Sequence, residues 1–263
     1  MKRSSSKSMV AILAACSLLT ACGSDSDSGT NPAPRDLEAG KVKNLILMIG
    51  DGMGAQQVGL LEEYARRSPN NEAGVASVTG LQKFADNGRM GLSLNAPRGA
   101  NPSLVVDSAC SATQLATGMG SISEAVGLDD KGNEVETILE KAKAMGKATG
   151  LISDTRLTHA TPAAFASHQP HRSYENEIAE DLLAVGVDVL LGGGSRHWIP
   201  DTDFAALAAE LHAPTHVIKK TKRDDDRNLV LEAKEAGYGL AFTKEQLAAA
   251  TGTKLLGLFD DSA

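Results

Sequence analysis

Short apolar runs that alternate with helical patterns constrain the fold of this chain most strongly. The runs have the length and composition of buried strands, and between them apolar residues recur at helical spacing. They cover residues 44–49, 151–153, 187–191 and 254–259. Strands that alternate with helices are typical of a mostly parallel sheet covered on both faces. The sequence therefore predicts an α/β fold, in which ligands bind beyond the carboxyl ends of the strands.

Two helix boundaries can be predicted from capping residues. Asn133 is a candidate N-cap for a helix that ends at Gly146. Thr243 and Gln246 form a capping-box pattern in front of a second helix.

The first forty residues are predicted to lie outside the fold. A basic start precedes an apolar stretch, 9–19, that is too short to span a bilayer. Small residues then lead to Cys22, as in a bacterial lipobox, which indicates a signal peptide over 1–21 and a lipidated Cys22. An ordinary signal peptide with an incidental cysteine is the alternative. Residues 22–40 predict a flexible tether to a domain over 41–263, in an exported, periplasmic or cell-surface lipoprotein anchored to a membrane.

The net charge of -7 limits what the chain can bind. An acidic chain without a long basic run argues against nucleic acid as a specific partner. An anionic substrate would have to be attracted by a local cationic site, because the overall field is repulsive. Of the three cysteines, Cys16 lies in the signal and Cys22 would carry lipid, so Cys110 has no partner for a disulfide in the mature domain.

A glycine-rich turn over 50–54 follows the first apolar run. Its spacing is not that of the dinucleotide-binding G-x-G-x-x-G motif, and Asp51 inside it would repel a pyrophosphate. A carboxylate at this place suits a hard or borderline cation better. A solvated aspartate in a turn is the alternative, and this segment alone leaves both open.

The segment 106–118 places Asp107 or Ser108 at the start of a helix with a small alanine face. Backbone N–H groups at such a terminus favour an anion. Ser108 is therefore either a nucleophile that becomes phosphorylated or simply an N-cap. No G-x-S-x-G motif surrounds it, and a serine without a nearby base needs another activator, which a bound metal can supply.

A third segment, over residues 157–172, carries two threonines, three histidines and an arginine. Pro162 restricts Thr161 to extended backbone, and the Thr161 hydroxyl could face a cation. Arg172 could bind two phosphate oxygens at once, which lysine cannot; a surface arginine near a helix start is the alternative. His168 and His171 are interpreted as solvated loop histidines rather than ligands.

Three blocks, in this order and spacing, resemble the alkaline phosphatase family. They are NLILMIGDGMG at 44–54, DSACSAT at 107–113 and HATPAA at 159–164, with Arg172 eleven residues after Thr161. The resemblance covers about residues 41–263 and implies a three-layer α/β/α sandwich. It also implies hydrolysis of phosphate monoesters to an alcohol and inorganic phosphate through a phosphoserine, and it leaves a homodimer open.

The resemblance further implies a site with two Zn²⁺ and one Mg²⁺. By position, Asp51 would bridge a zinc and the magnesium, and Ser108 would be the nucleophile lying on a zinc. Thr161 would be a ligand on the magnesium side, and Arg172 would hold the phosphate. His159 would be either a ligand in the magnesium shell or a contact through water.

The chain departs from the family in its zinc ligands. The family takes the remaining ones from a C-terminal half with Asp-x-x-x-His and Asp-His patterns, neither of which occurs here, and the last histidine is His216. We therefore expect the N-terminal part of an alkaline phosphatase, with the C-terminal portion of the fold missing. Two alternatives stay open: an inactive lipoprotein remnant, and a related metallo-phosphodiesterase or sulfatase.

Overall fold

The computed structural model describes residues 42–68, 79–202 and 204–262. The chain divides into two units, residues 1–49 and 50–263. The predicted signal peptide and the whole of the predicted tether, including Cys22, lie outside the described residues. Within the described ranges, no helix combines the length and the apolar character needed to cross a membrane.

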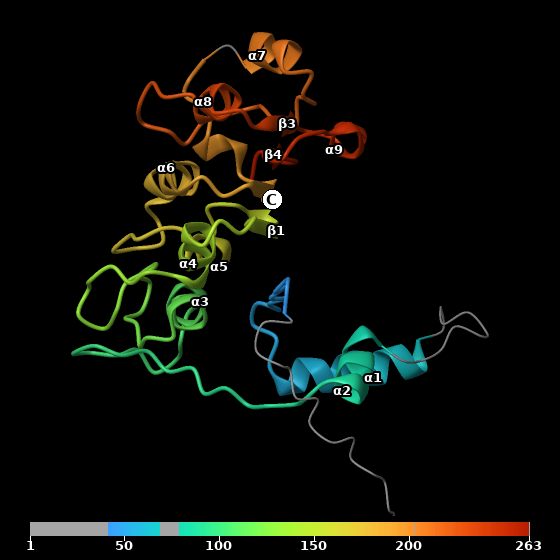
Figure 1. The fold of residues 1–263 in the computed structure, drawn as a ribbon, viewed down its shortest axis with the longest axis vertical. Coiled ribbons are helices and arrows are strands. Elements are labelled where there is room, and N and C mark those ends of the chain that lie inside the picture. The colour runs from blue at the N-terminus through green and yellow to red at the C-terminus, as the bar shows by residue number, and fades with distance from the viewer. Residues whose placement is uncertain (1–41, 69–78, 203, 263) are drawn as a thin grey trace, which may run out of the picture. The chain divides into compact units, whose positions relative to one another are not determined.

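The second unit contains one four-stranded sheet and the helices that alternate with its strands (Figure 1). The strand order is β1-β2-β4-β3, and every neighbouring pair is parallel. The strands are β1 (Gly150–Arg156), β2 (Val189–Gly193), β3 (Gly239–Ala241) and β4 (Leu255–Leu258). The helices are α1 (Ala55–Arg67), α2 (Gly80–Asn87), α3 (Ser108–Thr117), α4 (Ile138–Ala144), α5 (Ala160–Ala163), α6 (Glu175–Val185), the 3₁₀ turn η1 (Ser195–His197), α7 (Phe204–Glu210), α8 (Leu229–Glu235) and α9 (Lys244–Ala249).

The parallel pairing confirms the predicted α/β class. β1, β2 and β4 form over three of the four predicted apolar runs. β3 was not predicted, because three residues are too few to show a periodic pattern.

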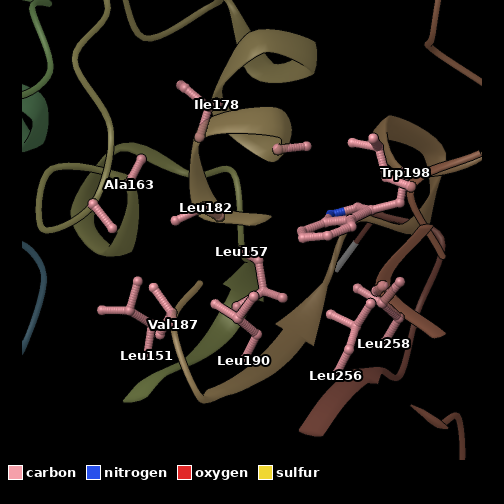
Figure 2. Packing of buried hydrophobic residues seen from close by; sticks show 14 of the residues in the cluster. Leu151, Leu157, Ala163, Ile178, Leu182, Val187, Leu190, Trp198, Leu256 and Leu258 are labelled. Carbon is pink, nitrogen blue, oxygen red and sulfur yellow. The ribbon is translucent and has the colours of Figure 1, made fainter. Parts of the chain in front are cut away.

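One face of the sheet forms the centre of the hydrophobic core. Successive side chains of a strand point to opposite faces, and on one face Leu151 and Leu190 are buried and adjacent in register. Figure 2 shows side chains of this face meeting those of α6, which contributes Ile178 and Leu182. At the next position along β1, Ile152 points to the other face and is 74% exposed.

The strand predicted over 44–49 is wrong for this structure. Residues 42–50 have neither helix nor strand, and Leu45 and Ile46 are 78% and 83% exposed. An apolar run is compatible with a buried strand, but a strand also needs hydrogen bonds from a neighbour. The run itself does not specify that neighbour.

The predicted start of α4 is also wrong, by four residues. Thr137, not Asn133, is the N-cap: its hydroxyl accepts from the Glu140 N–H at 3.2 Å, and its own N–H donates to the Glu140 carboxylate at 2.7 Å. Asn133 instead closes a turn by donating its N–H to Asp129 Oδ1 at 2.8 Å. Thr243 is confirmed as the N-cap of α9, since its hydroxyl accepts from the Gln246 N–H at 3.2 Å. The reciprocal half of the capping box is not formed, because the Gln246 side chain accepts from the Phe242 N–H and not from that of Thr243.

Two antiparallel bridges shape the loop that follows α3. Val126 and Gln169 exchange two backbone hydrogen bonds of 2.9 Å, and Leu128 pairs with Glu134. Gly127 lies between these bridges with φ of 66°. A Cβ atom there would be 2.1 Å from the Ser167 carbonyl oxygen, so only glycine fits.

Leu190→Ala tests which face of the sheet is the core. Leu190 is fully buried, so we expect the free energy of unfolding to fall by about 2–5 kcal/mol. The matched control is Ile152→Ala on the opposite face, where the loss should be about 1 kcal/mol or less. Urea denaturation of both variants measures the difference, and a loss from Ile152→Ala as large as that from Leu190→Ala would contradict the assignment of the core to one face.

Candidate active site

Asp107 caps α3 and leaves the neighbouring serine outside that role. Its Oδ2 atom accepts from the N–H groups of Ala109 at 2.8 Å and Cys110 at 3.4 Å. Ser108 is therefore the first residue of the helix and not its N-cap. This decides between the two readings that the sequence left open for the cap, and it leaves the Ser108 hydroxyl available for other contacts.

Small side chains hold α3 against α5. Ala109, Ala112 and Ala116 of α3 are buried in the same core cluster as Ala160 and Ala163 of α5. The two helices are in contact, and small residues at a helix contact allow a short distance between the axes. The alanine face predicted from the sequence thus brings the start of α3 close to the residues around α5.

A bulge at the end of β1 positions the segment that leads into α5. The register with β2 shifts after Ile152 and resumes at Arg156, opposite Gly193. The Arg156 guanidinium donates to both carboxylate oxygens of Glu175, at 2.7 and 3.2 Å. His159 follows beyond the carboxyl end of β1, where the fold class predicts a ligand site.

Arg172 brings Ser108 and His159 into one hydrogen-bonded group. Its NH1 atom donates to Ser108 Oγ at 2.8 Å, and its NH2 atom donates to His159 Nε2 at 3.0 Å. NH1 also lies 3.6 Å from Asp107 Oδ2. The reading of Arg172 as a surface arginine is therefore wrong: its side chain is turned toward the start of α3.

His159 lies in an environment that favours its neutral form. Burial, followed by the positive charges of Arg172 and Arg156, holds the pKa of His159 below its ordinary value. An uncharged imidazole keeps one nitrogen free of a proton. Nε2 can then accept the hydrogen bond from Arg172, so in this structure His159 orients the arginine.

Asp51 and Thr161 form a second pair of site residues. The Thr161 hydroxyl donates to Asp51 Oδ2 at 3.0 Å, although the two residues are far apart in sequence. The extended backbone predicted for Thr161 is wrong, since Thr161 lies in α5. Pro162 is tolerated there because it falls in the first turn, where a helix N–H has no partner inside the helix. A carboxylate oxygen and a hydroxyl oxygen are a donor set suited to a hard cation such as Mg²⁺. The pair would fit part of such a site.

A complete zinc site is not formed by the part of the chain that the structure describes. Over residues 42–68, 79–202 and 204–262, no three His, Cys, Asp or Glu side chains gather in a group that could hold a metal. A catalytic zinc usually has three protein ligands. The oxygen atoms of Asp51 and Thr161 fit part of a magnesium site better than a zinc site with a full set of protein ligands.

The two loop histidines differ from each other. His171 is half exposed, as predicted. His168 is not solvated: Nδ1 contacts the Gly127 carbonyl and Nε2 contacts Glu140 Oε1, both at 2.9 Å. No local pattern predicts this role, because the two partners come from other segments of the chain.

The family model described as "Alkaline phosphatase" matches residues 42–263. The chain belongs to the alkaline phosphatase family. Alkaline phosphatase 4 of Bacillus subtilis is 31% identical over 97% of this chain, and the alkaline phosphatase of Escherichia coli is 32% identical over 83%. Among solved structures, Thermus thermophilus alkaline phosphatase matches 81% of this chain with a TM-score of 0.64 and 28% identity.

The chain covers only part of the length of its relatives. It spans about half the length of the curated relatives it matches, 50% of the B. subtilis protein and 46% of the E. coli one. The matched share of the T. thermophilus structure is 39%. The region that the family model covers contains all five candidate site residues, which are Asp51, Ser108, His159, Thr161 and Arg172.

His168 makes part of the stability depend on pH. Burial opposes its charge, but the hydrogen bonds to Glu140 and to the Gly127 carbonyl outweigh burial and hold the pKa of His168 above its ordinary value. A raised folded-state pKa contributes stability that is fully present below the ordinary value of about 6.5 and is lost as the pH rises through the folded-state pKa.

We therefore expect His168→Gln to lower the free energy of unfolding by about 1 kcal/mol at acidic pH, and by less at alkaline pH. Urea denaturation of the wild type and the variant at several pH values measures this difference. His171→Gln, at the half-exposed neighbour, is the control and should lower the free energy of unfolding less than His168→Gln. A His168→Gln loss that grows with pH would contradict the assigned direction.

Proposed function

We propose that this chain takes part in the hydrolysis of phosphate monoesters, with Ser108 as nucleophile and Arg172 as the phosphate-binding group. The observation that carries the proposal is the 2.8 Å hydrogen bond between Arg172 NH1 and Ser108 Oγ. It joins a guanidinium to a serine that begins a helix without serving as its N-cap, within a chain of the alkaline phosphatase family. A phosphoryl group that enters this contact would lie next to both the attacking oxygen and a cation.

Arg172 is suited to bind phosphate because of the shape of its side chain. A guanidinium can bind two oxygens of one phosphate at once. His159 and Asp107 hold it near the start of α3, which limits the freedom that it would lose on binding. It also provides the local positive charge that a chain of net charge -7 needs in order to attract an anion.

The reaction that we propose has two steps. Ser108 Oγ loses its proton and attacks phosphorus, so that the Oγ–P bond forms, the P–O bond to the alcohol breaks and the alcohol leaves with a proton. Water then attacks the phosphoserine, the Oγ–P bond breaks, and inorganic phosphate and free Ser108 are produced. Arg172 stabilises the charge that develops on the phosphoryl oxygens in both steps.

We propose that the site is completed by metal ions, with Asp51 and Thr161 as oxygen ligands of Mg²⁺. A variant of the alkaline phosphatase from the Antarctic bacterium TAB5, 26% identical over 64% of this chain with a TM-score of 0.51, has Mg bound. The family resemblance implies two Zn²⁺ ions as well, but the residues that the structure describes supply too few ligands for a zinc site. Bound metal would supply the Lewis acidity that lowers the pKa of a serine hydroxyl.

Ser108→Ala tests the nucleophile. With zinc and magnesium present, we expect the chain incubated with a ³²P-labelled phosphate monoester and quenched in acid to carry label on Ser108, and Ser108→Ala to carry none. Ser111, one turn further along α3, gives the matched control: its hydroxyl donates to the Ser108 carbonyl, so Ser111→Ala should retain the label. Label on any residue other than Ser108, or none on the wild type, would refute the proposal.

We also propose that the chain is exported and anchored to a membrane through lipid on Cys22. The support is the lipobox-like pattern before Cys22 and the polar segment over 23–40. More than one acyl chain would be needed for stable attachment. Mass spectrometry of the protein from a bacterial membrane fraction should find residue 22 acylated at a new N-terminus, and Cys22→Ala should release the protein. An unmodified N-terminus elsewhere would disprove the anchor.

A further inference from the structure

Glu124 has a backbone conformation that residues with a side chain seldom adopt. Its φ is 65°, in the left-handed region, where Cβ crowds the backbone. Among the described residues other than glycine, His212 is the second with positive φ, at 51°. Strained positions persist only where the surroundings enforce them, and they cluster at functional sites.

Three contacts hold Glu124 between the start of α3 and Arg172. Its N–H donates to Asp107 Oδ1 at 2.9 Å, and its carbonyl accepts from the Arg172 N–H at 2.8 Å. Its carboxylate oxygen Oε2 then lies 3.8 Å from Arg172 Nε. One residue thus fixes the main chain of the arginine and places a negative charge beside its guanidinium.

The carboxylate lies on a different side of the guanidinium from the proposed phosphate contacts. NH1 and NH2 point to Ser108 and His159, whereas Glu124 faces Nε. Glu124 therefore does not occupy the positions that phosphate oxygens would take. Its effect on a phosphate dianion is the repulsion between like charges, and that repulsion weakens as salt rises because the Glu124 side chain is 43% exposed.

We propose that the Glu124 carboxylate weakens the hold of Arg172 on phosphate and so favours release of the inorganic phosphate product. The inference rests on the proposed function, since it takes Arg172 as the phosphate-binding group. Asp107 differs from Glu124 in this respect, because its oxygens already accept hydrogen bonds from the N–H groups at the start of α3. Glu124 is thus the carboxylate whose charge can be removed without uncapping the helix.

Calorimetric titration with inorganic phosphate at pH 8 tests the inference without relying on activity. We expect Glu124→Gln to lower the Kd for phosphate about three- to tenfold at low ionic strength, and to lose most of that gain in about 1 M salt. A residue with a purely structural role would not show this dependence on salt. Glu235→Gln on α8 changes the net charge equally and should leave the Kd unchanged.

A second variant separates charge from backbone strain. Glu124→Gly removes both the carboxylate and the cost of positive φ, so it should also tighten phosphate binding and should raise the melting temperature. His212→Gly removes the same kind of strain elsewhere. It should raise the melting temperature without any change in phosphate affinity.

Arg172→Ala distinguishes failure of this inference from failure of the proposed function. Suppose that Arg172→Ala weakens phosphate binding. If Glu124→Gln then leaves binding unchanged, weakens it, or tightens it equally at all salt concentrations, the proposed role of Glu124 is wrong but the proposed phosphate site is supported. If Arg172→Ala has no effect, or if the wild type binds no phosphate, the proposed phosphate site is wrong and the role of Glu124 falls with it.

Discussion

The Asp107 carboxylate is the interaction on which the candidate site depends. Its two oxygens accept from the N–H groups of Ala109, Cys110 and Glu124, and Oδ2 lies 3.6 Å from Arg172 NH1. The first N–H groups of a helix have no partner inside the helix, and a capping carboxylate satisfies them while its charge suits the positive end of the helix dipole. One side chain therefore defines where α3 begins, attaches the loop after it and provides a counter-charge for the arginine.

The rest of the site follows from how three further segments meet this helix start. The alanine faces of α3 and α5 allow close packing, the bulge in β1 carries the chain past the sheet to His159, and the Val126–Gln169 bridge brings in the segment that ends at Arg172. Each of these contacts uses backbone groups or small side chains. The polar side chains at their meeting point are thus held by structure that does not itself take part in binding.

The sequence predicted the parts of this arrangement that are local. Apolar runs located β1, β2 and β4, the capping-box pattern located α9, and the family blocks singled out Asp51, Ser108, Thr161 and Arg172. It failed where the outcome depends on partners distant in sequence. The run 44–49 has the pattern of a strand but is not one here, and His168 looked like a loop histidine although Glu140 and Gly127 enclose it.

Glu124 shows the same limit at the level of one residue. No local pattern indicates a left-handed glutamate, since the conformation is enforced by Asp107 on one side and Arg172 on the other. The choice between Asp107 and Ser108 as the N-cap was likewise open in the sequence, because both residue types are good caps. The hydrogen-bond geometry decided it.

The two bridges around Gly127 have a consequence for how the length of the chain can vary among related proteins. The turn that joins Leu128 to Glu134 closes on itself through Asp129, so residues added or removed at its tip would not move the bridged pair at its base. The stretch from Gln169 to Arg172 has no such freedom. Its first residue is paired with Val126 and its last with Glu124, and one inserted residue would turn the guanidinium away from Ser108. The turn between Leu128 and Glu134 can therefore vary in length, whereas the stretch from Gln169 to Arg172 cannot.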